Sequence, residues 1–234
     1  MIVNESTSLE IEKWVSQFFS NEIDSGHDFW HTKRVRYNAL NIQKAEGGDK
    51  IIIEVAALLH DLVDEKLFDS QKMNILILEK LKGYNFSENQ VRDINEIINN
   101  LSFSKELEGM SSESTEFKIV QDADRLDALG AIGIARAFSY GNKKQRPFFD
   151  PLYLPGNPTS KEEYRNLNSP TINHFFEKLL RLPGMMKTKT GKVLAEERTV
   201  FLKSYLYQFI NEWPALSDDV KDQWIHQISS FDNN

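Results

Sequence analysis

The histidines and carboxylates of this 234-residue chain include three short groups that can share one chemistry. The first is His27-Asp28-Phe29-Trp30-His31, the second is His60-Asp61, and the third is Asp122-Ala123-Asp124-Arg125-Leu126-Asp127. Imidazole and carboxylate suit divalent ions such as Mn, Fe, Zn, Ni or Mg, and the chain has no cysteine to bias a site toward zinc. If three helices bring these groups to one interior point, an ion there would acidify water and offset the charge of a phosphate.

The second group ends the most apolar stretch of the chain, residues 51–66. Between Ile51 and Leu59 only Glu54 is charged, so a helix here is apolar almost all round and should be buried. Ionisable groups at the end of a buried helix are costly unless they are paired, and a metal ion is one efficient partner. The alternative is that the helix reaches the surface at His60 and the following acids are solvated, and this stretch alone leaves both hypotheses open.

Apolar residues recur at helical spacing along most of the chain, and strand signals are nearly absent. This pattern predicts an all-α fold, a helical bundle of about ten helices that forms a single domain over residues 1–234. The expected helices are 7–19, 28–45, 51–66, 70–82, 87–101, 117–138, a short one from 160, 171–182, 192–213 and 217–230, with capping boxes at Thr7 and Ser87.

Two segments are expected to be irregular. Residues 102–116 are polar and rich in Ser and Glu, and residues 139–159 contain several Gly and Pro. Long loops in compact domains are often functional. The sequence leaves open whether 139–159 closes over a substrate as a lid.

The charge balance restricts the classes of partner. With 28 Lys and Arg against 35 Asp and Glu, the net charge is −7, which argues against binding of a nucleic acid polymer. A small phosphate-bearing substrate remains compatible if a metal and a few local cations supply positive charge. We find no signal peptide and no window approaching the ~18 apolar residues of a membrane span, so a cytoplasmic protein without membrane contact is expected.

Several side chains are candidates to act on phosphate groups. Arg binds phosphate in a bidentate manner and Lys acts as a point charge, although most such residues are simply solvated. The candidate cations are Lys66, Arg125, Lys144, Lys187 and Lys189. His27 lies one turn before His31 on the same helix face, and it can protonate a leaving phosphate or be a solvated residue at the helix start.

These groups resemble the signature His … His-Asp … Asp of the HD-domain metal-dependent phosphohydrolases. The blocks HDFWHTKRV, AALLHDLVDEK and QDADRLDALGAIGIARAF are similar to those of a small bacterial branch that hydrolyses nucleoside triphosphates to the monophosphate and pyrophosphate. TINHFFEKLL and TGKVLAEER are similar to the C-terminal blocks of that branch. The resemblance covers roughly residues 5–213 and leaves 214–234 unplaced.

The resemblance implies a set of metal ligands. They are His31, His60, Asp61 and one aspartate of the third group. Asp124 is the expected one, because the ligand of this family most often stands in an Ala-Asp-(any)-Leu setting, and Asp122 is the fallback. The resemblance makes Mn the most expected ion, with Mg, Ni, Co, Fe or Zn as alternatives.

The resemblance also implies a catalytic role for the acids that follow the His-Asp pair. Asp64 and Glu65 match an acidic pair that positions or deprotonates the attacking water in related hydrolases. Asp64 is the preferred general base, and for Glu65 a solvated surface position is an equal alternative.

The expected function is therefore hydrolysis of a (deoxy)nucleoside triphosphate to the monophosphate and pyrophosphate. The alternatives are a nucleoside 5′-monophosphatase, a cyclic-nucleotide phosphodiesterase, or a non-catalytic nucleotide-binding helical protein that has kept the metal site. An oxygenase with two irons would need further ligands and is the least favoured. The sequence leaves open the base and sugar of the nucleotide, the physiological ion, and whether the chain forms a homodimer.

Overall fold

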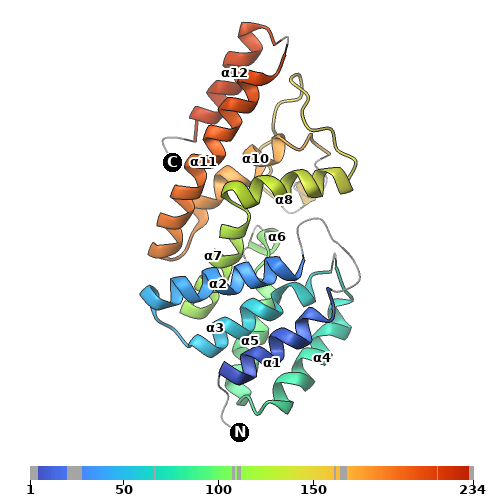
Figure 1. The fold of residues 1–234 in the computed structure, drawn as a ribbon, viewed down its shortest axis with the longest axis vertical. Coiled ribbons are helices and arrows are strands. Elements are labelled where there is room, and N and C mark those ends of the chain that lie inside the picture. Colours follow the sequence, from blue (N-terminus) through green and yellow to red (C-terminus); the bar gives the residue numbers. More distant parts are fainter. Residues whose placement is uncertain are drawn as a thin grey trace. The chain divides into compact units, whose positions relative to one another are not determined.

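The computed structural model describes residues 5–19, 28–65, 67–106, 109, 112–160, 162–163, 168–214 and 216–231 of the chain. These residues form helices and connecting segments without a strand, which confirms the all-α class (Figure 1). The chain divides into two compact units, unit 1 (Met1–Asp124) and unit 2 (Arg125–Asn234). A single domain over 1–234 stays a prediction. None of the described helices combines the length and the apolar character that a bilayer crossing requires.

Among the described residues, unit 1 contains six α-helices and one 3-10 helix, together with most of a seventh α-helix. They are α1 (Glu5–Ser16), α2 (Phe29–Glu46), α3 (Lys50–Leu59), the 3-10 helix η1 (His60–Val63), α4 (Ser70–Gly83), α5 (Glu88–Asn100), α6 (Phe103–Glu106) and α7 (Thr115–Asp127). The last three residues of α7 belong to unit 2.

Helix α3 is the centre of unit 1. Every residue from Ile52 to Leu59 is buried, and α1, α2 and α5 pack against the helix (Figure 1). Its N-terminus is capped by Asp49, whose carboxylate accepts hydrogen bonds from the N–H groups of Ile51 and Ile52. The predicted buried helix is confirmed, and at its end the chain tightens into η1.

The single buried charged side chain within α3 is held by partners on two other helices. Glu54 accepts hydrogen bonds from Ser8 Oγ of α1 at 3.0 Å and from Arg36 Nε of α2 at 2.8 Å. Arg36 also pairs with Glu12 of α1 at 3.0 Å. A buried charge is tolerated only when it is paired, so this network fixes α1 and α2 on α3.

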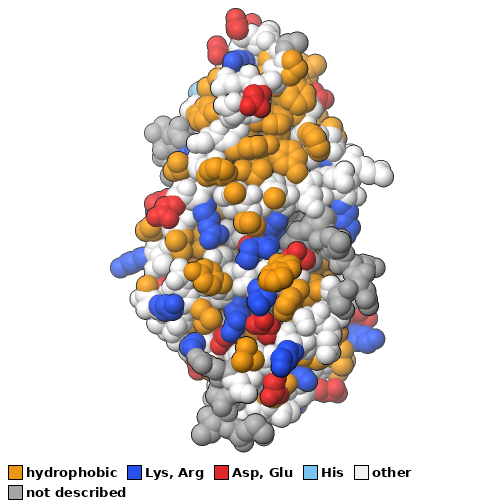
Figure 2. Space-filling model, in the orientation of Figure 1, with side chains coloured by type: hydrophobic (Ala, Val, Ile, Leu, Met, Phe, Trp, Pro, Cys, Tyr) orange, Lys and Arg blue, Asp and Glu red, His pale blue; other side chains and the backbone are white. Residues whose placement is uncertain are grey.

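Unit 2 contains α8 (Gly130–Lys143), α10 (Asn173–Glu177), the 3-10 helix η2 (Leu179–Met185), α11 (Lys189–Glu212) and α12 (Asp218–Ser229). Helix α11 packs against α8, η2 and α12. Part of the core is aromatic: the Phe149 ring lies 4.8 Å from that of Trp224 and 5.0 Å from that of Trp213. Figure 2 shows hydrophobic side chains gathered on one face of this unit, over α11 and the loop that follows α8.

The prediction of one helix over 117–138 is wrong. Helix α7 ends at Asp127 and α8 begins at Gly130, because Leu129 is extended (φ −113°, ψ 163°). Gly130 has φ +66°, a conformation that is inexpensive only for glycine, and a Cβ there would lie 3.4 Å from Arg198. The break therefore uses the glycine for its backbone angle, since a Cβ would make only an ordinary contact with Arg198 of α11.

Other boundaries also differ from those predicted. Helix α1 begins at Glu5, so Thr7 lies inside it and is not its cap, whereas the capping box at Ser87 is confirmed. Residues 102–116 include α6 and the start of α7, and α8 extends to Lys143. The segment 171–182 divides into α10 and η2, and α11 starts earlier than expected, with Thr188 as its cap.

The irregular loop of unit 2 runs from Lys144 to Ser160, and hydrogen bonds fix it at many points. Two loop carbonyls accept from backbone N–H groups: Pro147 from Thr171 and Phe148 from Ile172. Three more accept from side chains: Pro151 from Trp224 Nε1, Tyr153 from Asn173 Nδ2, and Pro158 from Arg181 Nη1. The loop N–H of Gly156 donates to Glu177 Oε1. Opening this loop would cost these bonds, which argues against the lid hypothesis.

Candidate metal centre

The candidate metal centre lies in unit 1, where three helical segments bring four side chains together. Helix α2 carries His31 in its first turn, and the cap residue Asp28 accepts a 2.7 Å hydrogen bond from the His31 N–H. The η1 turn carries His60 and Asp61, and the last turn of α7 carries Asp124. The buried end of α3 therefore does not reach the surface at His60, which is 7% exposed.

The donor atoms of these side chains face one point. His31 Nε2 lies 3.2 Å from His60 Nε2, 3.4 Å from Asp61 Oδ2 and 3.5 Å from Asp124 Oδ1. His60 Nε2 lies 3.2 Å from Asp61 Oδ1 and 3.8 Å from Asp124 Oδ1. Two ligands about 2.1 Å from one ion lie about 3.0–3.4 Å apart at octahedral or tetrahedral angles. The spacings among the two histidines and Asp61 fall in this range and those to Asp124 are slightly longer, so the four side chains are close to the arrangement around a single divalent ion.

The orientation of His60 is set by the backbone. Its Nδ1 lies 2.9 Å from the Ala57 carbonyl of α3, and the N–H at Nδ1 donates to that oxygen. The Nε2 atom is therefore the nitrogen that faces the other donors, an arrangement that orients metal-binding histidines in general.

The cluster carries a strong electrostatic preference for a cation. Burial lowers the pKa of His60, but the charge and hydrogen bond of Asp61 and the charge of Asp124 outweigh burial and raise this pKa to about 9. A proton on His60 therefore satisfies the carboxylates when no ion is bound. Metal binding to such a site must release that proton.

The geometry favours Asp124 over Asp122 as the fourth side chain of the cluster. The donor atoms of His31, His60 and Asp124 all lie within 4.8 Å of one another. Asp122 is fully buried and does not belong to this group in the described part of the chain. Asp61 is not one of the three either, but its two oxygens approach His31 and His60 at 3.4 and 3.2 Å. The Asp124 side chain is 32% exposed while those of His31 and Asp61 are buried, so the cluster is open on the Asp124 side.

The acids proposed to act on water follow the cluster closely. Asp64 caps η1 and is half-buried, and its N–H donates to the Asp61 carbonyl at 3.2 Å. Glu65 is exposed. Their catalytic roles stay predictions, and His27 and Lys66 lie outside the described residues.

The remaining candidate cations belong to unit 2. Arg125 is 5% exposed, its Nη1 donates to the Met185 carbonyl, and burial lowers its pKa to about 10. The others are exposed at the surface of unit 2: Lys144, Lys187 and Lys189. Phosphate binding by all four stays a prediction.

Sequence analysis missed two polar residues near the cluster. Asn38 donates from Nδ2 to the Ala123 carbonyl at 3.3 Å and so holds α2 beside the turn that carries Asp124. Gln121 is 1% exposed, and its amide oxygen and nitrogen have no hydrogen-bond partner among the described residues. Asn38 lies two turns after His31, and Gln121 lies three residues before Asp124, so helical spacing was the available signal.

Comparison with known proteins gives a consistent family. The HD domain family matches residues 29–129. The uncharacterized protein YpgQ of Bacillus subtilis is 36% identical over 210 residues, which cover 88% of this chain and 94% of YpgQ.

Solved structures extend the likeness to the fold. The crystal structure of YpgQ in complex with ADP is 34% identical with a TM-score of 0.71, and covers 90% of this chain and 100% of that chain. A Lactobacillus plantarum protein is 35% identical with a TM-score of 0.81, covering 92% and 100%. A Bacillus thuringiensis protein described as an HD-superfamily hydrolase is 36% identical with a TM-score of 0.69, covering 91% and 99%.

Proposed function

This chain belongs to the HD-domain family of hydrolases, and from that premise we propose that it hydrolyses (deoxy)nucleoside triphosphates to the monophosphate and pyrophosphate. One observation carries the proposal: two imidazole nitrogens and two carboxylates of unit 1 face one point at spacings of 3.2–3.8 Å. This donor set is typical of a divalent ion and holds no thiolate.

The residues proposed to hold the ion are His31, His60, Asp61 and Asp124. When bound there, a divalent cation supplies Lewis-acid chemistry, since it polarises a phosphoryl oxygen and lowers the pKa of water. We propose Mn as the ion, with Mg, Ni, Co, Fe or Zn as alternatives.

Two considerations support a nucleotide substrate. The relative YpgQ has been crystallised with ADP, a small phosphate-bearing molecule. Phosphoryl transfer depends mainly on positioning and on stabilising charge, which a cluster of this kind and a few Arg or Lys side chains can supply. The partly exposed Asp124 gives a substrate phosphate a side from which to approach the cluster.

In the proposed reaction a water oxygen attacks the α-phosphorus, and the bond from this phosphorus to the α–β bridging oxygen breaks. Asp64 orients that water and takes its proton, with Glu65 as the second acid, and pyrophosphate leaves. Arg125, Lys144, Lys187, Lys189 and Lys66 are proposed to bind the phosphates, and His27 to assist the leaving group.

The test is a panel of nucleotides with Mn, combined with metal analysis of the purified protein. We expect pyrophosphate as the product from nucleoside triphosphates. Asp61→Ala should lose both the metal and hydrolysis, whereas Asp64→Ala should keep the metal and lose about 100-fold or more in rate. Glu79→Ala, at an exposed position of α4, is the matched control.

The same panel separates the alternatives. Orthophosphate from nucleoside monophosphates, or opening of cyclic nucleotides, would replace the proposed reaction by one of the two related ones. Nucleotide binding without hydrolysis in Mn, Mg, Ni and Co would indicate a non-catalytic nucleotide-binding protein. A folded Asp61→Ala variant with full metal content and full rate would show that the ligand assignment is wrong.

A further inference from the structure

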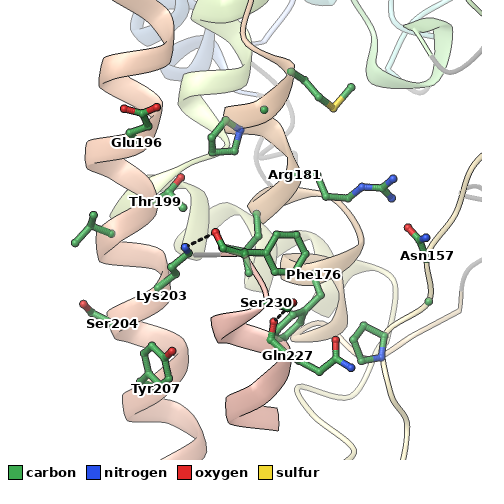
Figure 3. Close-up of a pocket in the computed structure, with 18 residues that line it drawn as sticks. Asn157, Phe176, Arg181, Glu196, Thr199, Lys203, Ser204, Tyr207, Gln227 and Ser230 are labelled. Carbon is green, nitrogen blue, oxygen red and sulfur yellow. Dashed lines mark hydrogen bonds between the residues drawn. The ribbon is translucent and has the colours of Figure 1, made fainter. Parts of the chain in front are cut away.

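Unit 2 contains a cavity of about 1290 Å³ that shares no residue with the metal centre (Figure 3). Five segments form its walls: the loop at residues 155–157, α10 with Phe176, η2, the middle of α11, and the end of α12 with the residues after it. The loop wall is fixed in place, because the Gly156 N–H donates to Glu177 and the Pro158 carbonyl accepts from Arg181. These hydrogen bonds fix the loop side of the cavity, so the cavity is largely pre-formed, as small-molecule sites usually are.

One side of the cavity carries a positive charge without a carboxylate partner. Arg181 of η2 donates from Nη1 to the backbone carbonyls of Pro158 at 3.1 Å and Glu177 at 3.4 Å. No acidic side chain of the described residues forms an ion pair with it. Figure 3 shows Arg181 extending toward the side on which Asn157 lies, and Asn157 is exposed. A guanidinium and an amide on one side of a cavity suit an anionic group.

A second positive charge comes from the opposite wall. In Figure 3, Lys203 of α11 points toward Phe176, and its Nζ donates to the Phe231 carbonyl at 2.7 Å. Glu196, on the same helix, is exposed. Of the two cationic side chains, that of Arg181 contacts carbonyl oxygens, whose partial charges offset a cation only in part.

The body of the cavity is apolar and aromatic. Phe176 and Leu180 are 4% and 5% exposed, and Tyr207 of α11 and Phe231 lie at the sides. The buried Phe176 ring packs against Trp224 at an interplanar angle of 61° and against Phe231 at 56°, which fixes the aromatic side of the cavity. An aromatic wall of this kind favours a planar ring.

We propose that this cavity is a second binding site, for a small organic anion that carries a planar ring, with the anionic group at Arg181 and Asn157 and the ring against the partly exposed Tyr207 and Phe231. A nucleoside monophosphate has this chemistry, and its choice as the probe rests on the proposed function, which makes it the product. The site itself requires no metal, since Arg181 and Asn157 are donors for an anion, the lining carboxylate Glu196 is exposed, and the cavity lies outside the metal centre.

The experiment is a calorimetric titration of AMP into the full-length protein, once with EDTA and once with Mn. We expect a site that persists in EDTA. Arg181→Gln should weaken this binding about tenfold or more, because it removes a charge-assisted hydrogen bond, and Arg181→Lys should retain part of it.

A blocking variant gives an independent test that does not depend on Arg181. Gly184 of η2 lines the cavity, and a Cβ built there meets no heavy atom within 4 Å, so Gly184→Trp adds bulk at the wall without an initial clash. Gly83 at the end of α4 is equally open and lies in unit 1, which makes Gly83→Trp the matched control. Binding in EDTA should be lost in Gly184→Trp and kept in Gly83→Trp.

The outcomes decide between the proposal and its rivals. Absence of AMP binding in EDTA, or equal binding by wild type, Arg181→Gln and Gly184→Trp, would overturn the site. Inorganic phosphate and decanoate separate the two parts of the ligand: equal binding of phosphate alone, or tighter binding of decanoate than of AMP, would overturn the planar ring. Because the EDTA titration involves no hydrolysis, failure of the proposed reaction leaves its result unaffected.

Discussion

The two units satisfy their buried polar side chains in different ways, unit 1 mainly with side chains of other helices and unit 2 mainly with the backbone. In unit 1, Glu54 pairs with Arg36 of α2, and His60 faces Asp61 and His31. The helical backbone around them has already used most of its donors and acceptors, so side chains supply most of the partners, although His60 and Asn38 also donate to backbone carbonyls.

In unit 2 the partners are backbone groups of the Lys144–Ser160 loop. Asn173 donates to the Tyr153 carbonyl at 2.8 Å, and Glu177 accepts from the Gly156 N–H at 3.2 Å. A loop against a core brings unpaired peptide groups that must find hydrogen bonds. The comparison indicates that buried charge in unit 1 is available for chemistry, whereas buried polarity in unit 2 holds irregular chain in place.

The largest effect on stability is expected in unit 1. Glu54→Ala should lower the free energy of unfolding by about 3 kcal/mol, because the partly buried Arg36 guanidinium would lose its buried carboxylate partner. Urea unfolding measures the change, and Glu10→Ala at an exposed position of α1 is the control. A loss below about 1 kcal/mol would remove the distinction between the units.

The second prediction concerns the proton that the metal centre holds. With the pKa of His60 at about 9, affinity for Mn should rise about tenfold per pH unit from pH 7 and level off above pH 9. In the metal-free protein this raised pKa means that protonated His60 contributes stability below about pH 6.5, which is lost as the pH rises through 9.

A competitive chelator titration between pH 7 and pH 10 checks this dependence. His226→Ala, at an exposed position of α12, should leave the profile unchanged. An affinity that is independent of pH over this range would contradict a protonated cluster.

A smaller effect is expected when a bond to the loop is removed. Asn173→Ala should cost about 1 kcal/mol, because the Tyr153 carbonyl loses its donor. Amide hydrogen exchange should become faster in the loop and remain unchanged in α3. Asn142→Ala, at an exposed position of α8, is the control, and unaltered exchange in the loop would count against the role assigned to Asn173.

The smallest effect concerns the other loop contact. Burial raises the pKa of Glu177, against the opposing influence of Ser169, the Gly156 N–H and Arg146. A raised carboxyl pKa means that ionisation costs more in the folded state, so wild type loses stability as the pH rises from about 4.5 through the folded pKa. Glu177→Gln should therefore gain relative to wild type between pH 4 and pH 7, on the order of 1 °C in Tm.

Glu163→Gln provides the comparison of opposite sign. The Thr159 N–H and hydroxyl lower the pKa of the exposed Glu163 carboxyl, so any stability that it contributes is present at neutral pH and is lost as the pH falls. Thermal melts of both variants across the same pH range should show trends in opposite directions. Parallel trends would contradict the assigned direction for Glu177.

The helices of unit 1 were predicted better than those of unit 2, because unit 1 is built from local helical patterns and unit 2 depends on contacts between segments distant in the chain. The apolar run of α3 and the capping box at Ser87 are local patterns, and each forms the element expected of it. At the break before Gly130, Arg198 of α11 donates to the Leu126 carbonyl, and a contact with a residue so distant in the chain lies outside the reach of local periodicity. Likewise, α10 and η2 replace the one continuous helix that was predicted, and their side chains Asn173 and Arg181 form hydrogen bonds with the Lys144–Ser160 loop.

The candidate site shows the same division. Residue types and the family resemblance identified His31, His60, Asp61 and Asp124 as candidates, with Asp122 as the fallback, but spacing along α7 alone could not separate the two aspartates. That distinction needs the position of α7 against α2, which Asn38 fixes through the Ala123 carbonyl. Contacts between side chains of different helices have no fixed spacing along the chain, so periodicity cannot predict them.

The bonded loop of unit 2 has a consequence for proteolysis. Leu152 is 85% exposed, but the flanking carbonyls of Pro151 and Tyr153 accept hydrogen bonds from Trp224 and Asn173. The peptide is therefore accessible to solvent but its backbone is fixed. A protease must accommodate a free, extended chain, and cleavage here would follow the population in which the loop has detached. The rate of nicking at Leu152 would thus measure the local opening of unit 2.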